Sequence, residues 1–143
     1  ADCIHQNYYS VLFNKETGII IANGDKGKEG TIEKVNKEIE NIFKYKTEEI
    51  KGVNVSQLMP PLLAKEHNEF MKNYYETGAK KLLDKKDKKV FGKDKDNCII
   101  LLKVIVKLFP ALNNNVFFVS LILKENVDDI IFIDSKFNIQ GMS

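Results

Sequence analysis

The chain has 143 residues, 43% of them apolar, and its 22 Lys and Arg against 20 Asp and Glu leave a net charge of +2. A chain of this length holds one domain with extensions at most, and its apolar content excludes wholesale disorder. The small net charge provides no long-range attraction to nucleic acid. All the basic residues are Lys, so the Arg fork that reads guanine edges and phosphates is missing.

The arrangement of the apolar residues argues against direct membrane insertion by this segment. The longest apolar run, 98–110, is shorter than the roughly 20 residues of a membrane span, and Lys103 and Lys107 interrupt it.

Cys3 and Cys98 lie far apart, outside any CxxC motif or Cys/His cluster. We therefore expect neither a disulfide framework nor a metal site, and we expect a reducing compartment on the cytoplasmic side.

A β-hairpin is expected to open the folded part, after a lead-in at residues 1–17. Residues 18–22 form a short, β-branched apolar run, whose length and composition favour a strand. Residues 23–30 are rich in Gly and in charged residues, which predicts a turn. Residues 31–35 predict the second strand of the hairpin.

Two short helices are expected after the hairpin. Asn36 can cap the first helix, because its side-chain oxygen can accept a backbone N–H that is left unpaired at a helix start. Ile39, Ile42 and Phe43 follow at helical spacing and define one apolar face. Thr47 can cap the second helix in the same way.

The longest helix is expected to run from Pro60-Pro61 to Gly78, because Pro is tolerated in a first helical turn and Gly is common just after a last one. Four residues fall within an arc of roughly 60° on one face: Leu63, His67, Phe70 and Tyr74. Charged residues lie on the opposite side: Lys65, Glu69, Lys72 and Glu76. We therefore expect the His67 side chain on the buried face of this helix.

The second half of the domain predicts three antiparallel strands, at residues 82–91, 98–109 and 116–124. Alternation predicts two sets of inward-facing residues, Ile100, Leu102, Val104, Val106 and Leu108 on the middle strand, and Phe117, Val119, Leu121 and Leu123 on the last. Two strands, several helices and three further strands make an α+β layout, in which helices cover one face of an antiparallel sheet.

Residues 126–143 are interpreted as a linker and the start of a following unit, which leaves residues 18–125 as the domain proper. Residues 130–134 are mostly apolar, residues 135–138 predict a turn, and residues 139–141 could form a second strand. This order repeats the pattern of the opening hairpin. The chain is therefore expected to belong to a longer protein.

Several stretches, taken in order, resemble a known family: 30–36 (GTIEKVN), 42–45 (IFKY), 49–52 (EIKG), 58–60 (LMP), 67–70 (HNEF) with Tyr74 and 77–78 (TG), and 92–94 (GKD) before two apolar strands. Their order and spacing are similar to those of PAS domains of the S-box type, over residues 18–125. Within that family the sequence most resembles PAS domains of tiny-macrocysts-like multi-pass membrane proteins of ciliates and other protists.

The resemblance implies a PAS fold, with a five-stranded antiparallel sheet and several helices packed on one face, around a small-molecule pocket or a plain core. It implies a non-catalytic sensory or interaction module of a larger signalling or membrane-associated protein. Such a module binds a small ligand or a partner protein and relays the change through its sheet and flanking linkers. Its partners are other domains of the same protein or separate proteins, and a homodimer is an open alternative.

Ten residues on the expected inner faces are candidates for lining such a pocket: Ile42, Phe43, Leu63, His67, Phe70, Tyr74, Leu102, Val104, Val119 and Leu121. Aromatic residues at these spacings also suit a packed interior, so a purely structural PAS unit with a filled core stays an alternative. No catalytic residue is assigned, because GxSxG, HExxH and P-loop motifs are missing. An acid/base role for His67 in a small enzyme or a lipid-binding domain is a further alternative.

No cofactor is expected. Flavin photosensors of the LOV type carry an Asn-Cys-Arg-Phe run where the present sequence reads GVNVS at 52–56, without a thiol. Haem is an alternative, because His67 matches the axial His of oxygen-sensing PAS domains of the rhizobial type, and imidazole is a usual haem ligand. The Arg residues that hold the propionates are missing, however, and the distal position falls near Asp87. Without haem, His67 is expected to pack in the core with its nitrogens hydrogen-bonded to neighbours.

Overall fold

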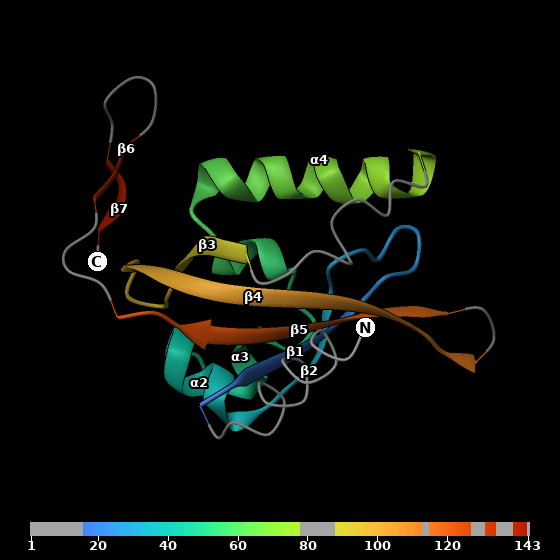
Figure 1. Cartoon of the computed structure of the whole chain (residues 1–143), viewed down its shortest axis with the longest axis horizontal. Coiled ribbons are helices and arrows are strands. Elements are labelled where there is room, and N and C mark those ends of the chain that lie inside the picture. Colours follow the sequence, from blue (N-terminus) through green and yellow to red (C-terminus); the bar gives the residue numbers. More distant parts are fainter. Residues whose placement is uncertain (1–15, 78–87, 113–114, 127–130, 134–138, 143) are drawn as a thin grey trace, which may run out of the picture.

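The structure, a computed structural model, describes residues 16–77, 88–112, 115–126, 131–133 and 139–142. A five-stranded antiparallel sheet has the strand order β2-β1-β5-β4-β3, and two further strands pair separately (Figure 1). The strands of the main sheet are β1 (Gly18–Asn23), β2 (Ile32–Val35), β3 (Lys88–Lys93), β4 (Ile99–Pro110) and β5 (Val116–Lys124). The expected five-stranded α+β layout is confirmed.

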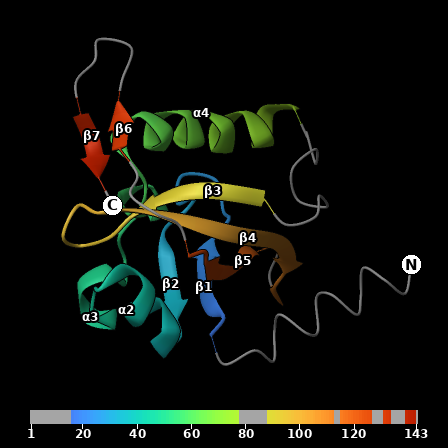
Figure 2. The same ribbon diagram turned by 60° about the vertical axis from the view of Figure 1, so that its left-hand side comes forward.

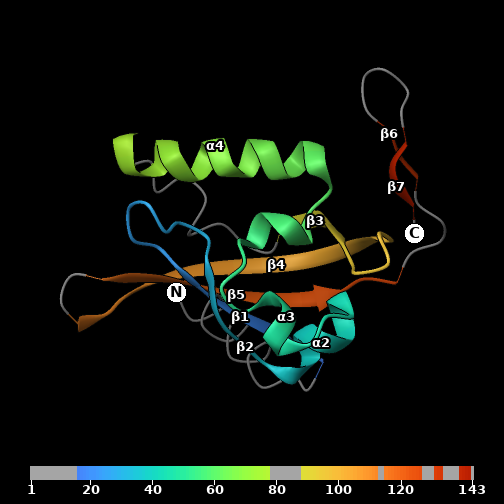
Figure 3. The same ribbon diagram turned by 180° about the vertical axis from the view of Figure 1, so that it is seen from behind.

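The helical segments described between β2 and β3 are α2 (Lys37–Phe43), α3 (Thr47–Ile50), the 3-10 turn η1 (Val55–Leu58) and α4 (Pro61–Thr77). Seen from behind the view of Figure 1, α3 lies across β1 and β2, and α4 runs along the β3 side of the sheet (Figure 3). Within the described part of the protein, no helix combines the length and the apolar character that crossing a lipid bilayer requires.

Asn36 ties the start of α2 to the first strand. Its Oδ1 accepts hydrogen bonds from the backbone N–H of Ile39 (3.3 Å) and of Ile19 (2.9 Å), and its Nδ2 donates to the carbonyl oxygen of Thr17 at 2.9 Å. The first of these bonds confirms the predicted N-cap. The second helix differs in detail, because Thr47 is its first residue and the capping position before it belongs to a lysine.

Strand register decides which residues of β4 and β5 face the helices. Val104 pairs with Ile122, and Leu102 pairs with Lys124. Directly paired residues of antiparallel strands point to the same face of a sheet. Leu102 and Ile122 both belong to the buried cluster beneath the helices. The even-numbered residues of β4 and β5 therefore share the helix-covered face, which confirms the expected orientation of β4.

The expected orientation of β5 is wrong with respect to the helices, although Leu121 is buried, with 1% of its surface exposed. Val119 pairs with Lys107 and Leu121 pairs with Ile105, so Val119 and Leu121 lie on the face opposite the helices. The alternation itself is present, but the strand is apolar on both faces: Phe117, Phe118, Val119, Leu121, Ile122 and Leu123. A period of two does not show which of two apolar faces is the inner one, because that choice depends on the neighbouring strands.

The core lies between the even-numbered face of the sheet and the helical segments α2, α3 and η1. Its buried residues are Ile20, Ala22, Ile32, Ile39, Ile42, Phe43, Ile50, Leu58, Ile100, Leu102 and Ile122. The three apolar residues predicted to form one face of α2 are all among them. Full burial of an Ile, Leu or Phe side chain stabilises the fold by about 1.5–3 kcal/mol, so this cluster is the main source of stability.

α4 begins at Pro61 and ends at Thr77, immediately before Gly78, as predicted. The side chains of Leu63 and His67 are half-buried, whereas Lys65 and Glu69 on the opposite side are exposed. The side chains of the other four residues predicted on these two faces, Phe70, Tyr74, Lys72 and Glu76, lie outside the described residues. Of the strand predicted at 82–91, residues 88–91 belong to β3 and residues 82–87 lie outside the described part.

The C-terminal segment contains the strand pair β6 (Ile131–Ile133) and β7 (Ile139–Met142), which are antiparallel neighbours in a two-stranded sheet (Figure 2). The predicted strand-turn-strand pattern of this segment is therefore confirmed for its two strands. The division of the sequence into a domain at 18–125 and a following unit stays a prediction.

Candidate functional site

Three of the ten pocket candidates, Ile42, Phe43 and Leu102, are brought together in the buried cluster beneath the helices, and Val104 packs against it. Phe43 is only 1% exposed and is among the largest fully buried side chains of the described residues. Val119 and Leu121 lie on the other face of the sheet, so they do not line the same space.

The Phe43 ring lies directly on the backbone of β3 at Gly92. A Cβ atom placed on Gly92 would stand 3.1 Å from Cε1 of Phe43 and 2.7 Å from Cδ1 of Leu102. Heavy atoms of neighbouring side chains do not normally approach so closely, so residue 92 must be Gly for Phe43 and Leu102 to keep their positions. The helix-covered core and the strand β3 are therefore in direct contact at this point.

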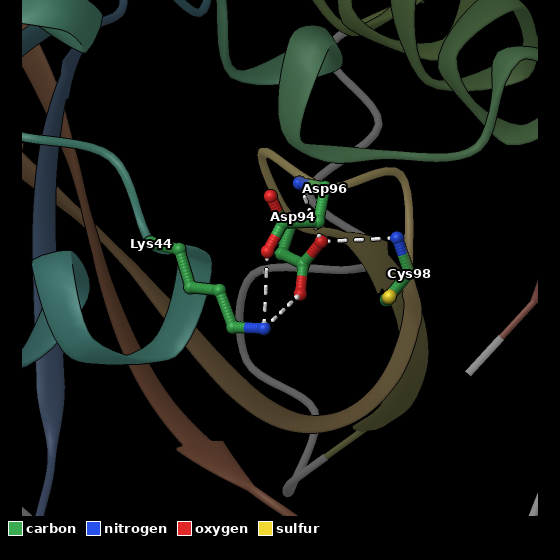
Figure 4. A network of polar contacts seen from close by, with 4 residues as sticks. All are labelled: Lys44, Asp94, Asp96 and Cys98. Carbon is green, nitrogen blue, oxygen red and sulfur yellow. Dashed lines mark hydrogen bonds and ion pairs between the residues drawn. The ribbon is translucent and has the colours of Figure 1, made fainter.

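The turn between β3 and β4 is built around the buried carboxylate of Asp94, which is 2% exposed. One oxygen, Oδ1, accepts hydrogen bonds of 2.9 Å from the backbone N–H groups of Asp96 and Cys98. The other oxygen, Oδ2, lies 3.5 Å from Nζ of Lys44, which also pairs with Asp96 at 3.3 Å (Figure 4). Because two N–H groups and one ammonium group surround it, the buried carboxylate is well satisfied.

Lys44 occupies the C-cap of α2 in the left-handed conformation, with φ of 61°. That conformation ends the helix and is uncommon for a residue with a side chain. The turn between β3 and β4 also completes the helix end, because the backbone N–H of Lys95 donates a 2.9 Å hydrogen bond to the carbonyl oxygen of Phe43. A carbonyl group at a helix C-terminus, which has no partner within the helix, is thereby satisfied.

We refer to the contacts of Phe43, Lys44 and Glu49 with Gly92, Asp94, Lys95 and Asp96 as the α2–turn contact. In its outer part the Lys95 ammonium pairs with Glu49 of α3. The hydrogen bond with Lys95 lowers the pKa of Glu49, and the bond with Glu49 raises the pKa of Lys95. The hydrogen bond with Asp96 raises the pKa of Lys44, which the charge of Asp94 raises further. The exposed ion pairs of Lys95 with Glu49 and of Lys44 with Asp96 contribute little individually, and they add to the buried contacts beneath them.

The imidazole of His67 differs from its expected state. Its Nδ1 atom is buried and has no hydrogen-bond partner among the described residues, although both nitrogens were expected to have one. Burial lowers the pKa of His67 below its ordinary value of 6.5, because desolvation disfavours the charged imidazolium. The ring is therefore neutral at neutral pH, and it keeps an unused hydrogen-bonding position on the inner side of α4.

Two depressions on the surface contain none of the ten pocket candidates. One, of about 360 Å³, is lined by Gly27, Lys28, Glu29, Thr31, Asn54, Ser56 and Asn68. The other, of about 270 Å³, is lined by Glu16, Glu38, Leu123, Lys124 and Asn126. Both are open to solvent, and polar residues dominate their linings. Within the described residues, no three His, Cys, Asp or Glu side chains converge in a way that could hold a metal ion.

The sequence reasoning missed the α2–turn contact. It did leave residues 92–97 as the connection between two predicted strands, and it did place Phe43 on the apolar face of α2. The pairing of Lys44 with Asp94 joins segments that are far apart in the sequence, and neither segment carries a local signal for the other. A buried Asp is rare without partners, but burial of Asp94 becomes visible only in the folded structure.

Comparison with known proteins gives a consistent result. A family model described as PAS domain matches residues 16–127. The chain is 29% identical over 113 residues to a probable serine/threonine-protein kinase of Dictyostelium discoideum, and the match covers 79% of this chain and 7% of that protein. The chain thus spans only a small part of the length of this curated relative.

Several solved structures are similar in fold. A PAS domain of a protein from Colwellia psychrerythraea has a TM-score of 0.61 and 16% identity, over 86% of this chain and 97% of that chain. A PAS domain of an HTR-like protein from Haloarcula marismortui has a TM-score of 0.59 and 13% identity, over 87% and 100% of the two chains. A PAS domain from a two-component sensor histidine kinase has a TM-score of 0.58 and 9% identity, over 87% and 98%.

Proposed function

Because this chain belongs to the PAS domain family, we propose that it is a non-catalytic sensory or interaction module of a longer signalling protein. It binds a small ligand or a partner protein against its helix-covered half and passes the resulting change to neighbouring domains. PAS domains are generally sensory modules without catalytic activity, and the similarity of this chain to part of a probable serine/threonine-protein kinase supports the proposal.

The observation that carries the proposal is that the first and the last strand of the domain, β1 and β5, are neighbours in the sheet. Gly18, the first residue of β1, pairs with Ile122 near the end of β5. The polypeptide therefore enters and leaves the domain side by side. α2 packs on the same point, because a Cβ atom on Gly18 would lie 2.5 Å from Cδ1 of Ile39. A displacement of α2 would consequently move both connections to the rest of the protein.

The α2–turn contact supports the same mechanism from the other end of the helix. The Phe43 ring, which is a pocket candidate, rests on β3, and the Phe43 carbonyl binds the turn between β3 and β4. A ligand or partner that shifts Phe43 would pull on this turn as well as on α2. The core, the outer strand β3 and the paired ends of the domain thus respond together.

The test is native mass spectrometry of the purified protein, compared with its mass under denaturing conditions. A mass excess that disappears on denaturation supports a bound small ligand. Two substitutions locate the ligand: Leu102→Ala on the helix-covered face and Leu121→Ala on the opposite face remove the same group from the same sheet. We expect the first to weaken retention of the ligand and the second to leave it unchanged. Equal loss with both variants would contradict a pocket beneath the helices.

A second candidate function is a purely structural PAS unit with a filled core. The tight packing of Phe43, Leu102 and the β3 backbone favours it, as does the position of both depressions outside the candidate residues. A bare mass in the native spectrum, with no binding of a partner protein or of a second copy, would support this function. A mass excess or self-association would support the sensory module.

Haem fits the described residues poorly. His67 has a free Nδ1 on the inner side of α4, as a ligand would need. However, it lines neither depression, and the sequence has no Arg to hold propionates. We therefore propose that the domain works without haem. Titration with hemin is expected to give no saturable Soret shift, and a one-to-one shift that is lost in His67→Ala would contradict this proposal.

The wider setting is also a proposal. We infer that the domain lies on the cytoplasmic side, where its partners are other domains of its own protein or separate proteins, with a homodimer as the alternative. The closer resemblance to tiny-macrocysts-like membrane proteins of protists stays a prediction, because the matches above concern the PAS family as a whole. The sequence of the full-length protein would test it, through membrane spans outside residues 1–143.

A further inference from the structure

The hairpin β6–β7 repeats the strand pairing of β1–β2. In the first hairpin Ile20 pairs with Val35, Ile21 with Lys34 and Ala22 with Ile32, and the register shifts between Ile21 and Ala22. In the second, Ile131 pairs with Met142, Phe132 with Gly141 and Ile133 with Ile139, and the register shifts between Phe132 and Ile133. Two regular pairs, an irregularity and a third pair thus follow one another in the same order in both hairpins.

The leading strands of the two hairpins also share a continuous apolar run. β1 contains the run Ile19-Ile20-Ile21-Ala22, and β6 contains Ile131-Phe132-Ile133. Short continuous apolar runs are typical of strands that are covered on both faces. β1 has neighbours on both sides, because it lies between β2 and β5. β6 has the same kind of apolar run, but among the described residues it pairs with β7 alone.

Hydrogen-bond directions show which backbone groups of β6 correspond to the bonded edge of β1. Consecutive residues of an antiparallel strand bond alternately to the two neighbours. On the β2 side, the N–H of Asn23 donates to Thr31 and the carbonyl of Ile19 accepts from Asn36. On the β5 side, the N–H of Gly24 donates to the carbonyl of Val116. Odd-numbered residues of β1 therefore bond β2, and the even-numbered residues bond β5.

The corresponding edge of β6 lacks a strand within the described residues. When the residue pairs of the two hairpins are matched in order, Ile131 corresponds to Ile20 and Ile133 to Ala22. Ile20 and Ala22 are residues of β1 that bond β5. The backbone N–H and C=O groups of Ile131 and Ile133 therefore point away from β7. A two-stranded hairpin is at best marginally stable by itself, and an open, apolar edge is a ready template for another strand.

We propose that this edge of β6 is a strand-docking surface, which is filled by a strand from the part of the same protein that follows residue 143, antiparallel to β6 as β5 is to β1. The hairpin then opens a second unit with the topology of the first. In the first unit, the neighbour of β1 is β5, the last strand of the same unit. If the hairpin opens a second unit of this kind, the neighbour of β6 is the last strand of that second unit, in the same polypeptide. The length of the curated relative, of which the matched segment covers 7%, allows such an arrangement in a protein of this kind.

The experiment compares hydrogen exchange of two proteins, the segment 1–143 and a longer natural segment that continues for about 110 residues, roughly one more domain. The amides of Ile131 and Ile133 are expected to exchange at least about 100-fold more slowly in the longer protein. Phe132 serves as the internal control, since its N–H corresponds to one that bonds the partner within the hairpin. Equal exchange of Ile131 and Ile133 in both proteins would overturn the proposal.

Two further measurements exclude other occupants. In the segment 1–143, exchange at β6 should be fast whether sedimentation shows a monomer or a dimer. A dimer with slow exchange would mean that a second copy fills the edge, which contradicts the proposal. In the longer protein, Ile133→Pro removes the N–H that points to the open edge, and it should abolish one of two unfolding transitions. Loss of the transition of the five-stranded domain instead would show that the hairpin belongs to that domain.

Discussion

The backbone N–H of Lys95 donates a hydrogen bond to the carbonyl oxygen of Phe43, at 2.9 Å, and so joins the turn between β3 and β4 to the last residue of α2. The same Phe43 places its ring against Gly92. One core residue is thus held to an outer strand through both its backbone and its side chain. The stability of the domain is expected to depend on this contact.

Substitution of Gly92 by Ala should destabilise the domain, because the added Cβ would stand 2.7 Å from Leu102 and 3.1 Å from Phe43. Overpacking of this kind typically lowers the free energy of unfolding by about 1–3 kcal/mol. The measurement is the urea midpoint of unfolding. Lys93→Ala, in the same strand, is the control and should change the free energy of unfolding by less than about 0.5 kcal/mol. Equal stability of the two variants would show that β3 can move away from the core.

Substitution of Asp94 by Ala should be more damaging than substitution of Asp96, although both carboxylates pair with Lys44. Asp94 is 2% exposed and accepts two backbone N–H groups, which Ala would leave without an acceptor. An unsatisfied buried polar group costs about 1–3 kcal/mol, whereas loss of an exposed ion pair costs about 0–1 kcal/mol. Chemical unfolding of both variants measures the difference. If Asp96→Ala costs as much as Asp94→Ala, the turn is held by charge and not by the buried hydrogen bonds.

Substitution of Asn36 by Ala should destabilise the domain more than substitution of Asn41, which lies in the same helix. Asn36 caps α2 and also bonds the backbone at Ile19 and Thr17. Asn41 is exposed, and its bond joins another side chain of the helix. Loss of an N-cap costs about 0.5–2 kcal/mol, and the bonds to β1 should add to that. The measurement is the midpoint temperature of thermal unfolding. Equal midpoints for the two variants, within experimental error, would refute the tethering role of Asn36.

His67 should make the domain less stable in mild acid. Burial lowers its pKa in the folded state below the unfolded value of 6.5. As the pH falls through 6.5, the unfolded protein binds a proton that the folded protein does not, so the free energy of unfolding decreases. It recovers as the pH rises above 6.5. Urea unfolding between pH 5 and 8 should show this slope in the wild type and a smaller slope in His67→Gln, which does not titrate. His5 is present in both proteins, so it does not affect the difference between their slopes. An unchanged slope would mean that His67 titrates normally.

Local signals predicted much of the fold. The cap at Asn36, the apolar face of α2, the start of α4 at Pro61 and the bounds of β5 all depend on contacts within a few positions of the sequence. The family resemblance added the five-stranded antiparallel sheet with helices on one face, and the expectation of a sensory role. The pocket candidates were less predictable: Leu102 and Val104 lie beneath the helices as expected, whereas Val119 and Leu121 lie on the other face.

The sequence by itself determined where α2, α4 and β5 begin, because caps, prolines and hydrophobic periods act over a few residues. It also determined that the last hairpin resembles the first. Only the tertiary structure decided which face of β5 points inward, since both faces are apolar and the choice depends on pairing with β1 and β4. Only the tertiary structure brought Lys44 to Asp94. A buried carboxylate needs partners, and whereas two of them are backbone N–H groups of the same turn, the ammonium group comes from a distant segment.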